Sequence, residues 1–172
     1  MEPSRKLKVT PVGDREIVIT RGLDAPRRLV WEALTRPELI RRWLFLPPGW
    51  SMTACEEDVR VGGSFRWAWA GPDGKTAMTM RGVYREVVPP ERIVRTESFD
   101  MGCPNQAGEQ VATMVLTERA EKTTVTITVL FTSKEARDGL LASGMEQGMA
   151  AGYDQMEKLL AATAAQRLPQ GV

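Results

Sequence analysis

The order of the predicted elements constrains this chain most: a strand-like start, a glycine-studded helix near the C-terminus, and little but strands between them. Residues 16–21 alternate apolar and polar side chains before Asp24-Ala25-Pro26, and residues 144–153 carry glycines at helical spacing. An antiparallel sheet that curves around one long helix encloses a cavity. The order of elements therefore predicts a protein that holds a small apolar molecule.

Alternating hydrophobicity and turn residues divide most of the chain into strands. We expect strands at residues 7–12, 15–23, 51–57, 64–70, 76–88, 93–100, 111–118 and 123–132. Gly62-Gly63 suits a bulge or tight bend, Pro72-Asp73-Gly74 is a turn sequence, and Pro89-Pro90 separates two strands. Residues 101–109 are expected to form a loop. The pattern is that of an antiparallel meander.

Two short helices are expected after the strand that ends near residue 23. Asp24 and Pro26 can begin the first, because proline loses no hydrogen bond in the first turn of a helix. Thr35 and Glu38 have the spacing of a capping box, which predicts a second helix. A kink near Arg36-Pro37 is expected to separate the two helices.

The final helix is expected to run unbroken toward the C-terminus, with Thr132 or Ser133 as its cap. Gly144, Gly148 and Gly152 recur at four-residue spacing, and each costs about 1 kcal/mol relative to alanine inside a helix. Close packing of the helix backbone against the sheet would compensate this cost. The alternative is that the glycines make room for a ligand or for a second copy of the helix.

The composition limits the partners that the chain can have. Its 172 residues, 42% of them hydrophobic, predict a single domain over residues 1–172 with a core over about residues 15–163. A formal net charge of +1 lacks the basic surplus of a nucleic-acid binder, so no such partner is expected. No apolar stretch near the N-terminus reaches the length of a signal peptide or a membrane span. We therefore expect a cytoplasmic protein without membrane insertion.

The chain has no histidine, which excludes several kinds of catalytic and metal site. A Ser-His-Asp triad, a histidine base and a histidine-ligated metal cannot be built from it. Cys55 and Cys103 are the only cysteines, form no CxxC pair and are interpreted as reduced residues. We expect neither a metal site nor a cofactor.

Several short segments, spread from about residue 15 to residue 160, carry a resemblance to a known family. They lie at residues 24–31, 37–43, 58–63, 71–74, 82–86, 89–92, 96–100 and 144–149. In this order they resemble the SRPBCC, or START-like, superfamily, and most of all a bacterial branch similar to the C-terminal domain of activators of heat-shock-protein ATPase. The resemblance implies an α+β helix-grip fold: a bent antiparallel sheet wrapped around a long C-terminal helix, with two short helices after the first strand and an internal pocket. The superfamily includes lipid carriers, hormone receptors, polyketide cyclases and co-chaperone domains, so the fold alone does not give the function.

Aromatic and methionine side chains form the candidate ligand site. Phe65, Trp67 and Trp69 fall on one face of a strand by period-two alternation. The helix-grip arrangement implied by the resemblance would bring further candidates to the same interior: Trp43, Phe99, Met145, Met149 and Tyr153. Such side chains make an adaptable apolar lining. The alternative is that they simply fill the core.

The polar candidates for catalysis are Glu97, Tyr84 and Arg81. Glu97 lies between residues with strand propensity, so it can point inward and would then need a partner such as Arg81. An inward carboxylate could orient the polar end of a ligand or act as a general base. The alternative is the solvated outer face of the sheet, which is also our interpretation of Arg66. Glu146 could lie at the pocket mouth or in water.

Three functions are compatible with these patterns. The leading one is binding of a small hydrophobic molecule, a lipid or an aromatic polyketide-like compound, in a cavity between the sheet and the final helix, with no defined catalysis. The alternatives are a cyclase or dehydratase that uses acid-base residues of the cavity, and a co-chaperone that stimulates a heat-shock ATPase. Phe45 and Trp50 leave apolar surface near the first helices, and together with the glycine strip they favour a homodimer.

Overall fold

Eight strands form one antiparallel sheet in the computed structural model, which describes residues 4–75, 77–100 and 108–167. The spatial order of the strands is β1-β2-β8-β7-β6-β5-β4-β3. Their bounds are β1 (Lys8–Val12), β2 (Glu16–Leu23), β3 (Ser51–Glu57), β4 (Ser64–Ala70), β5 (Ala77–Val88), β6 (Arg92–Asp100), β7 (Gln110–Arg119) and β8 (Lys122–Leu130). Strands β3 to β8 follow one another as a meander, and β8 then pairs with β2. Residue 76 and residues 101–107, which belong to the predicted β5 strand and the predicted loop, lie outside the described residues.

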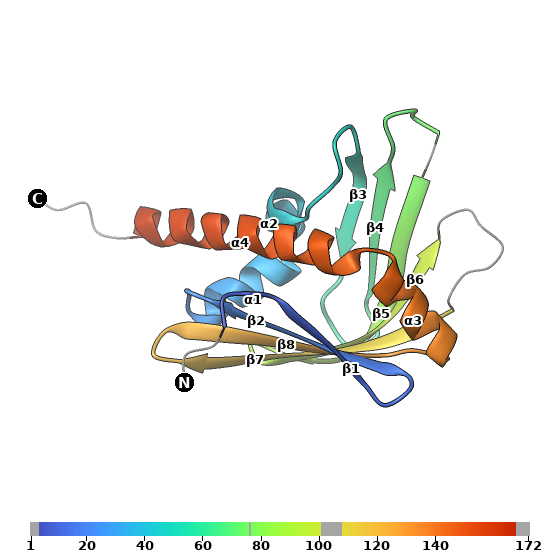
Figure 1. Cartoon of the computed structure of the whole chain (residues 1–172). Coiled ribbons are helices and arrows are strands. Elements are labelled where there is room, and N and C mark those ends of the chain that lie inside the picture. The colour runs from blue at the N-terminus through green and yellow to red at the C-terminus, as the bar shows by residue number, and fades with distance from the viewer. Residues whose placement is uncertain (1–3, 76, 101–107, 168–172) are drawn as a thin grey trace, which may run out of the picture.

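The sheet bends strongly between two groups of strands. In Figure 1, β3, β4 and β5 stand upright, whereas β1, β2, β7 and β8 run beneath the long C-terminal helix. The register of β5 against β6 shifts between Tyr84 and Glu86, which marks a bulge that increases the local bend. Nearby in β5, a Cβ atom on Gly82 would lie only 1.7 Å from the backbone oxygen of Thr96. Only glycine therefore permits this close approach of β5 and β6.

Two short helices follow β2: α1 (Arg27–Thr35) and α2 (Pro37–Trp43). The extended backbone of Arg36 ends α1, and Pro37 begins α2, so the predicted kink is confirmed. The predicted capping box is wrong. Thr35 is the last residue of α1, and its hydroxyl donates to the backbone oxygen of Trp31 at 2.7 Å, so it does not cap α2.

The C-terminal helical region consists of two helices, α3 (Lys134–Ala142) and α4 (Met145–Arg167), where the sequence predicted one unbroken helix. Gly144 has a φ of +79°, a left-handed backbone that glycine adopts without strain, and the helix breaks there. Ser133 caps α3, because its hydroxyl oxygen accepts a hydrogen bond from the backbone N–H of Ala136 at 3.0 Å. The regular glycine spacing thus did not reveal the break, since one of the three glycines ends a helix instead of packing inside it.

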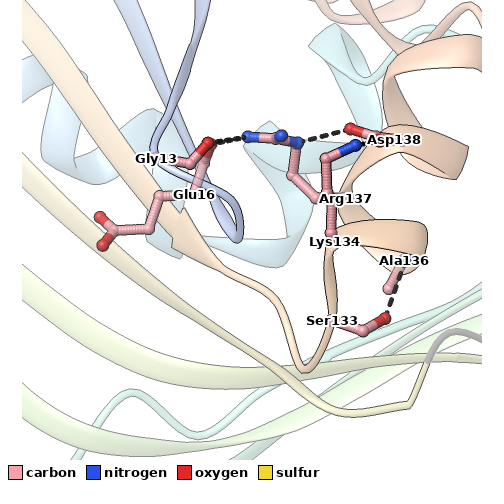
Figure 2. A network of polar contacts seen from close by, with 7 residues as sticks. All are labelled: Gly13, Glu16, Ser133, Lys134, Ala136, Arg137 and Asp138. Atoms are coloured by element: carbon pink, nitrogen blue, oxygen red, sulfur yellow. Dashed lines mark hydrogen bonds and ion pairs between the residues drawn. The ribbon is translucent and has the colours of Figure 1, made fainter.

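Arg137 fixes α3 to the turn between β1 and β2 (Figure 2). Its buried side chain donates from one terminal nitrogen to the backbone oxygens of Gly13 and Glu16, each at 3.1 Å. Its Nε donates to one carboxylate oxygen of Asp138 at 2.7 Å, and Lys134 pairs with the other at 2.9 Å. These bonds hold the start of the C-terminal region against a turn more than a hundred residues away in the sequence.

The core beneath the C-terminal half of α4 is filled with apolar side chains. Met156 is fully buried, and Leu159 and Leu160 are almost so. The α1 helix contacts α4, and just before α1 the backbone N–H of Asp24 donates to Glu157 at 3.3 Å. Figure 1 shows α4 crossing the concave side of the bent sheet with α1 and α2 beside it. The protein thus has the α+β helix-grip fold that the resemblance implied.

Candidate functional site

A cavity of about 510 Å³ lies between the inner face of the sheet, the segment after α2 and the N-terminal half of α4. The sheet contributes Ile17, Ile19, Trp67, Trp69, Met78, Met80, Ile93, Arg95, Glu97, Phe99, Gln110, Ala112, Met114, Ile127 and Val129. The helices and the segment after α2 contribute Leu34, Trp43, Leu44, Phe45, Leu46, Pro47, Trp50, Leu140, Met145, Gly148, Met149, Gly152 and Tyr153. Apolar and aromatic groups dominate this lining, as they do in sites for small molecules.

Two tryptophans of β4 form the most aromatic part of the sheet wall. Trp67 and Trp69 lie two residues apart, so the pleat places both on the inner face. Arg66, the residue just before Trp67, lies on the other face and is exposed. Their rings meet edge to face with centroids 6.3 Å apart. The indole N–H of Trp67 donates to Glu57 at 2.8 Å, which fixes that ring. The indole nitrogen of Trp69 is buried without a hydrogen-bond partner among the described residues.

The opposite wall is one face of α4. Met145, Met149 and Tyr153 recur every four residues, with Gly148 and Gly152 beside them, so all five line the cavity. The ring of Tyr153 stacks on Trp43, with centroids 5.9 Å apart and planes at 30°. Trp43 is held in turn by α1, because its indole N–H donates to the backbone oxygen of Ala33 at 2.7 Å. The helix wall, the end of α2 and α1 therefore support one another.

The three glycines of the predicted strip have three different surroundings. Gly144 breaks the helix, as described above. A Cβ atom on Gly152 would lie 3.5 Å from backbone atoms of Trp43 and Phe45, so this glycine lies where α4 passes close to the end of α2. A Cβ atom on Gly148 would meet nothing within 4 Å, and this residue lines the cavity. Gly152 therefore lies at ordinary packing distance from the end of α2, whereas Gly148 leaves room in the cavity.

A buried ion pair forms the polar part of the lining. Nε of Arg95 donates to Oε2 of Glu97 at 3.0 Å, and the side chains are each only 9% exposed. The amide of Gln110, opposite Glu97 in the β6–β7 register, donates to Oε1 of the same carboxylate at 3.0 Å. Both oxygens of Glu97 thus accept a charge-assisted or amide hydrogen bond, which is how a buried carboxylate keeps its charge.

A second polar layer lies behind Arg95. The guanidinium of Arg95 lies 4.1 Å from the ring centroid of Phe65 and 5.2 Å from that of Trp67, in cation–π contact. Burial lowers the pKa of Arg95, but the acidic groups around it raise the pKa by more than burial lowers it, so the guanidinium stays charged. Burial also raises the pKa of Glu57, and hydrogen bonds from Tyr84 and Trp67 oppose that rise. The arginine is therefore enclosed by aromatic rings and carboxylates.

The structure places all but one of the predicted ligand-site residues on the cavity wall. Those on the wall are Trp43, Trp67, Trp69, Phe99, Met145, Met149 and Tyr153. Phe65 is buried behind the lining, 5.7 Å from Trp67 and 5.9 Å from Tyr84 between ring centroids. Phe65 shares the alternation of the two tryptophans, but the guanidinium of Arg95, which lines the cavity, lies 4.1 Å from the centroid of its ring.

The polar candidates are not brought together. Glu97 lines the cavity, whereas Tyr84 is buried outside the lining and bonded to Glu57. Arg81 is exposed, so the expected Arg81–Glu97 pair is wrong. The physical reason is register: Arg81 lies opposite Ser98 in the β5–β6 pair and shares the outer face with it, one residue out of phase with Glu97. The other two candidates, Arg66 and Glu146, are exposed.

The partner that sequence reasoning missed is Arg95. It lies two residues before Glu97 on β6, so both side chains point to the inner face. This spacing was a usable signal, because a buried carboxylate is best paired by a basic residue on its own face. Gln110 and Glu57 had no comparable signal, since their contacts depend on which strands become neighbours.

The described residues contain no group of three or more Cys, Asp or Glu side chains that could hold a metal ion. Cys55 is buried, and burial raises the pKa of its thiol to about 11, so it is a poor nucleophile. Cys103 lies outside the described residues. Within 4–75, 77–100 and 108–167, no helix is both long and apolar enough to cross a bilayer.

A protein-family comparison matches most of the chain. The model of the family described as "Activator of Hsp90 ATPase homolog 1-like protein" matches residues 24–161. That range begins just before α1, ends in α4 and includes nearly every residue that lines the cavity. A comparison with curated proteins gives no match.

Solved structures of bacterial proteins have the same fold. A crystal structure from Rhodobacter sphaeroides is 30% identical, with a TM-score of 0.84, and the match covers 91% of this chain and 99% of that one. One from Nitrosomonas europaea is 26% identical, with a TM-score of 0.75 over 90% of this chain and 99% of that one. A solution structure from Staphylococcus epidermidis is 28% identical, with a TM-score of 0.73 over 94% and 96%.

Proposed function

The chain belongs to the Activator of Hsp90 ATPase homolog 1-like family, and we propose that it binds a small, largely apolar molecule between its sheet and α4. The observation that carries this proposal is the cavity of about 510 Å³ with its aromatic and methionine lining. Protein interiors are normally close-packed, with few voids larger than a water molecule. A space of this size falls within the range of roughly 300–1,000 Å³ that is usual for small-molecule sites.

Binding has more support than catalysis of the cyclase or dehydratase kind. Such an enzyme needs acid-base groups that converge on the substrate. Arg81 is exposed, Tyr84 does not line the cavity, and both oxygens of Glu97 accept hydrogen bonds from protein groups. The lining supplies shape and apolar surface, with one charge-paired polar region.

Tryptophan fluorescence tests the proposal directly, because four of the five tryptophans line the cavity. We expect a screen of fatty acids, flavonoids and aromatic polyketides to yield compounds that change the emission and raise the melting temperature. Trp31→Phe removes the one tryptophan outside the lining and should leave that response intact. If no compound alters either signal, the proposal is wrong.

A matched pair of glycine variants locates the site. Gly148 lines the cavity and Gly139 lies exposed on α3, and a Cβ atom would meet nothing within 4 Å at either position. Gly148→Leu should therefore fill part of the cavity and weaken binding by about tenfold or more. Gly139→Leu adds the same side chain elsewhere and should leave binding unchanged. Equal effects of the two variants would place the ligand outside the cavity.

The family description supports one alternative, because it names an activator of the Hsp90 ATPase. If this chain acts as such a co-chaperone, adding it to a heat-shock ATPase should raise the rate of ATP hydrolysis. An unchanged rate at saturating protein would contradict that function. The Gly148→Leu variant serves as a control, since stimulation through an outer surface should not depend on the cavity.

We also propose a homodimer, which the apolar surface of Phe45 and Trp50 supports and the glycine strip does not. Gly152 packs against the end of α2, so the strip is not a free face. Phe45 remains 40% exposed at the cavity edge, and Trp50 lies in the same segment. A symmetric interface would cover this apolar surface on both copies. Light scattering that gives a mass near 19.1 kDa would contradict the dimer.

A further inference from the structure

The charges that line the cavity are balanced. Among the described residues, Arg95 and Glu97 are the only charged side chains in the lining, and they pair with each other at 2.9 Å. One positive and one negative group leave this wall without net charge. The next carboxylate, Glu57, lies behind Arg95 and does not line the cavity.

Neither member of the pair is free to neutralise an ionised ligand. Glu97 accepts a hydrogen bond on each of its two oxygens, from Arg95 and from Gln110. The guanidinium of Arg95 lies against the faces of Phe65 and Trp67 as well as beside Glu97. A charged head group brought into this space would lose its hydration without gaining an unpaired counter-charge, which is strongly unfavourable.

An uncharged hydrogen-bonding group is available on the opposite wall. Tyr153 is 3% exposed and lines the cavity, yet its hydroxyl makes no hydrogen bond with any described residue. Burial raises the pKa of Tyr153, so the phenol is neutral at physiological pH and keeps its proton. A neutral phenol that lacks a partner can donate to an acceptor oxygen of a ligand.

Resting on the proposed binding function, we infer that the cavity selects uncharged ligands that carry an acceptor oxygen, and that the Tyr153 hydroxyl binds this oxygen. The chemical class is an apolar ketone, ester, alcohol or phenol, as opposed to a carboxylate or an amine. Aromatic rings and methionines hold the apolar body of such a molecule. The paired charges of Arg95 and Glu97 exclude the ionised analogues.

A set of ligands with one hydrocarbon chain and different head groups tests the selection. Octanoate, octylammonium and 1-chlorooctane do not absorb where tryptophan does, and the carbonyl of octan-2-one absorbs there only weakly, so the emission of the cavity tryptophans reports their binding. At neutral pH we expect octan-2-one to bind at least about tenfold more tightly than either ion. If octanoate or octylammonium binds as tightly as the ketone, this inference is overturned, but the proposed binding function is not. If none of the four binds, the inference fails, whereas the proposed function is decided by the broader ligand screen.

Two variants test the residues assigned to this selection. Glu97→Gln leaves Arg95 as an unpaired cation, so the affinity for octanoate relative to the ketone should rise by about tenfold or more. Tyr153→Phe should lower the affinity for octan-2-one by about five- to tenfold through loss of one hydrogen bond, and it should leave the affinity for 1-chlorooctane unchanged. Tyr84→Phe is the matched control, because this tyrosine is buried but does not line the cavity.

Each variant result decides one part of the inference. An unchanged ratio of octanoate to ketone affinity in Glu97→Gln would overturn the role of the charge pair. An unchanged ketone affinity in Tyr153→Phe would overturn the role of the hydroxyl. The comparison of the four ligands needs no variant, so it decides the selection even if Glu97→Gln does not fold.

Discussion

The two halves of α4 lie against the same sheet but differ in what they leave between helix and strands. Beneath the C-terminal half, Met156, Leu159 and Leu160 are buried among apolar side chains of α1 and the sheet. Beneath the N-terminal half, Met145 and Met149 are only partly buried, and a cavity of about 510 Å³ remains. One helix thus closes a filled core at one end and a hollow at the other.

Hydrophobic patterning does not by itself fill the space between helix and sheet. Met145 and Met149 in one half, and Met156, Leu159 and Leu160 in the other, recur at helical spacing, so both halves are apolar on their inner faces. The N-terminal half has glycine at positions 148 and 152, and the strands opposite it bend away with β3 to β5. Small residues facing a curved sheet leave the hollow, and the packing of α1 beside the other half removes it.

The largest effect is expected at the buried ion pair of the hollow half, which should not tolerate loss of either partner. Glu97→Ala leaves Arg95 as a buried cation without its partner, which should lower the free energy of unfolding by about 3–5 kcal/mol. Glu86→Ala removes the exposed pair with Arg92 and should cost under about 1 kcal/mol. Urea unfolding measures both variants. Similar costs would mean that the buried pair contributes no more than a surface pair.

A pair of methionine truncations tests the comparison itself. Met156→Ala creates a cavity in a filled core and should cost about 2–5 kcal/mol of unfolding free energy. Met149→Ala, two helical turns earlier, enlarges space that already exists and should cost under about 1 kcal/mol. Urea unfolding midpoints and slopes measure both. Equal losses would show that the two halves are packed alike.

Alanine at the cavity glycine should stabilise the protein. Gly148→Ala relieves the helix of a flexible residue and its Cβ meets nothing within 4 Å, so the gain should approach about 1 kcal/mol. Gly139→Ala offers the same gain on exposed α3 and serves as the matched control. Thermal unfolding monitored by circular dichroism measures both changes. A loss of stability confined to position 148 would show that its surroundings are filled.

The smallest effect concerns pH and the layer behind the cavity wall. Burial raises the pKa of Glu57 above its usual value of 4.5, so the folded state holds this proton more tightly than the unfolded state. The stability that Glu57 contributes is therefore full below the unfolded pKa and is lost as pH rises through the folded pKa. As the pH rises from acidic to neutral, the free energy of unfolding of Glu57→Gln should therefore increase relative to that of the wild type. Urea unfolding of both proteins across this range tests the sign, and a gain on acidification instead would contradict it.

The alternation of side chains determined the strands and the direction of the residues on them. Trp67 and Trp69 on β4, and Glu97 on β6, face inward as their period-two positions require, because the pleat is a property of the local backbone. Pro37 marked the kink at Arg36-Pro37 in the same local way. These features needed no knowledge of the rest of the fold.

Only the tertiary structure decided which partners these side chains meet. The strand register placed Arg81 opposite Ser98 on the outer face, away from Glu97, and it placed Gln110 of β7 opposite the carboxylate, to which its amide donates. Gly144, Gly148 and Gly152 look equivalent in the sequence, yet one ends a helix, one borders the cavity and one packs against α2. Local geometry fixes the face on which a side chain lies, whereas the space before it depends on elements from distant parts of the chain and on the bend of the sheet.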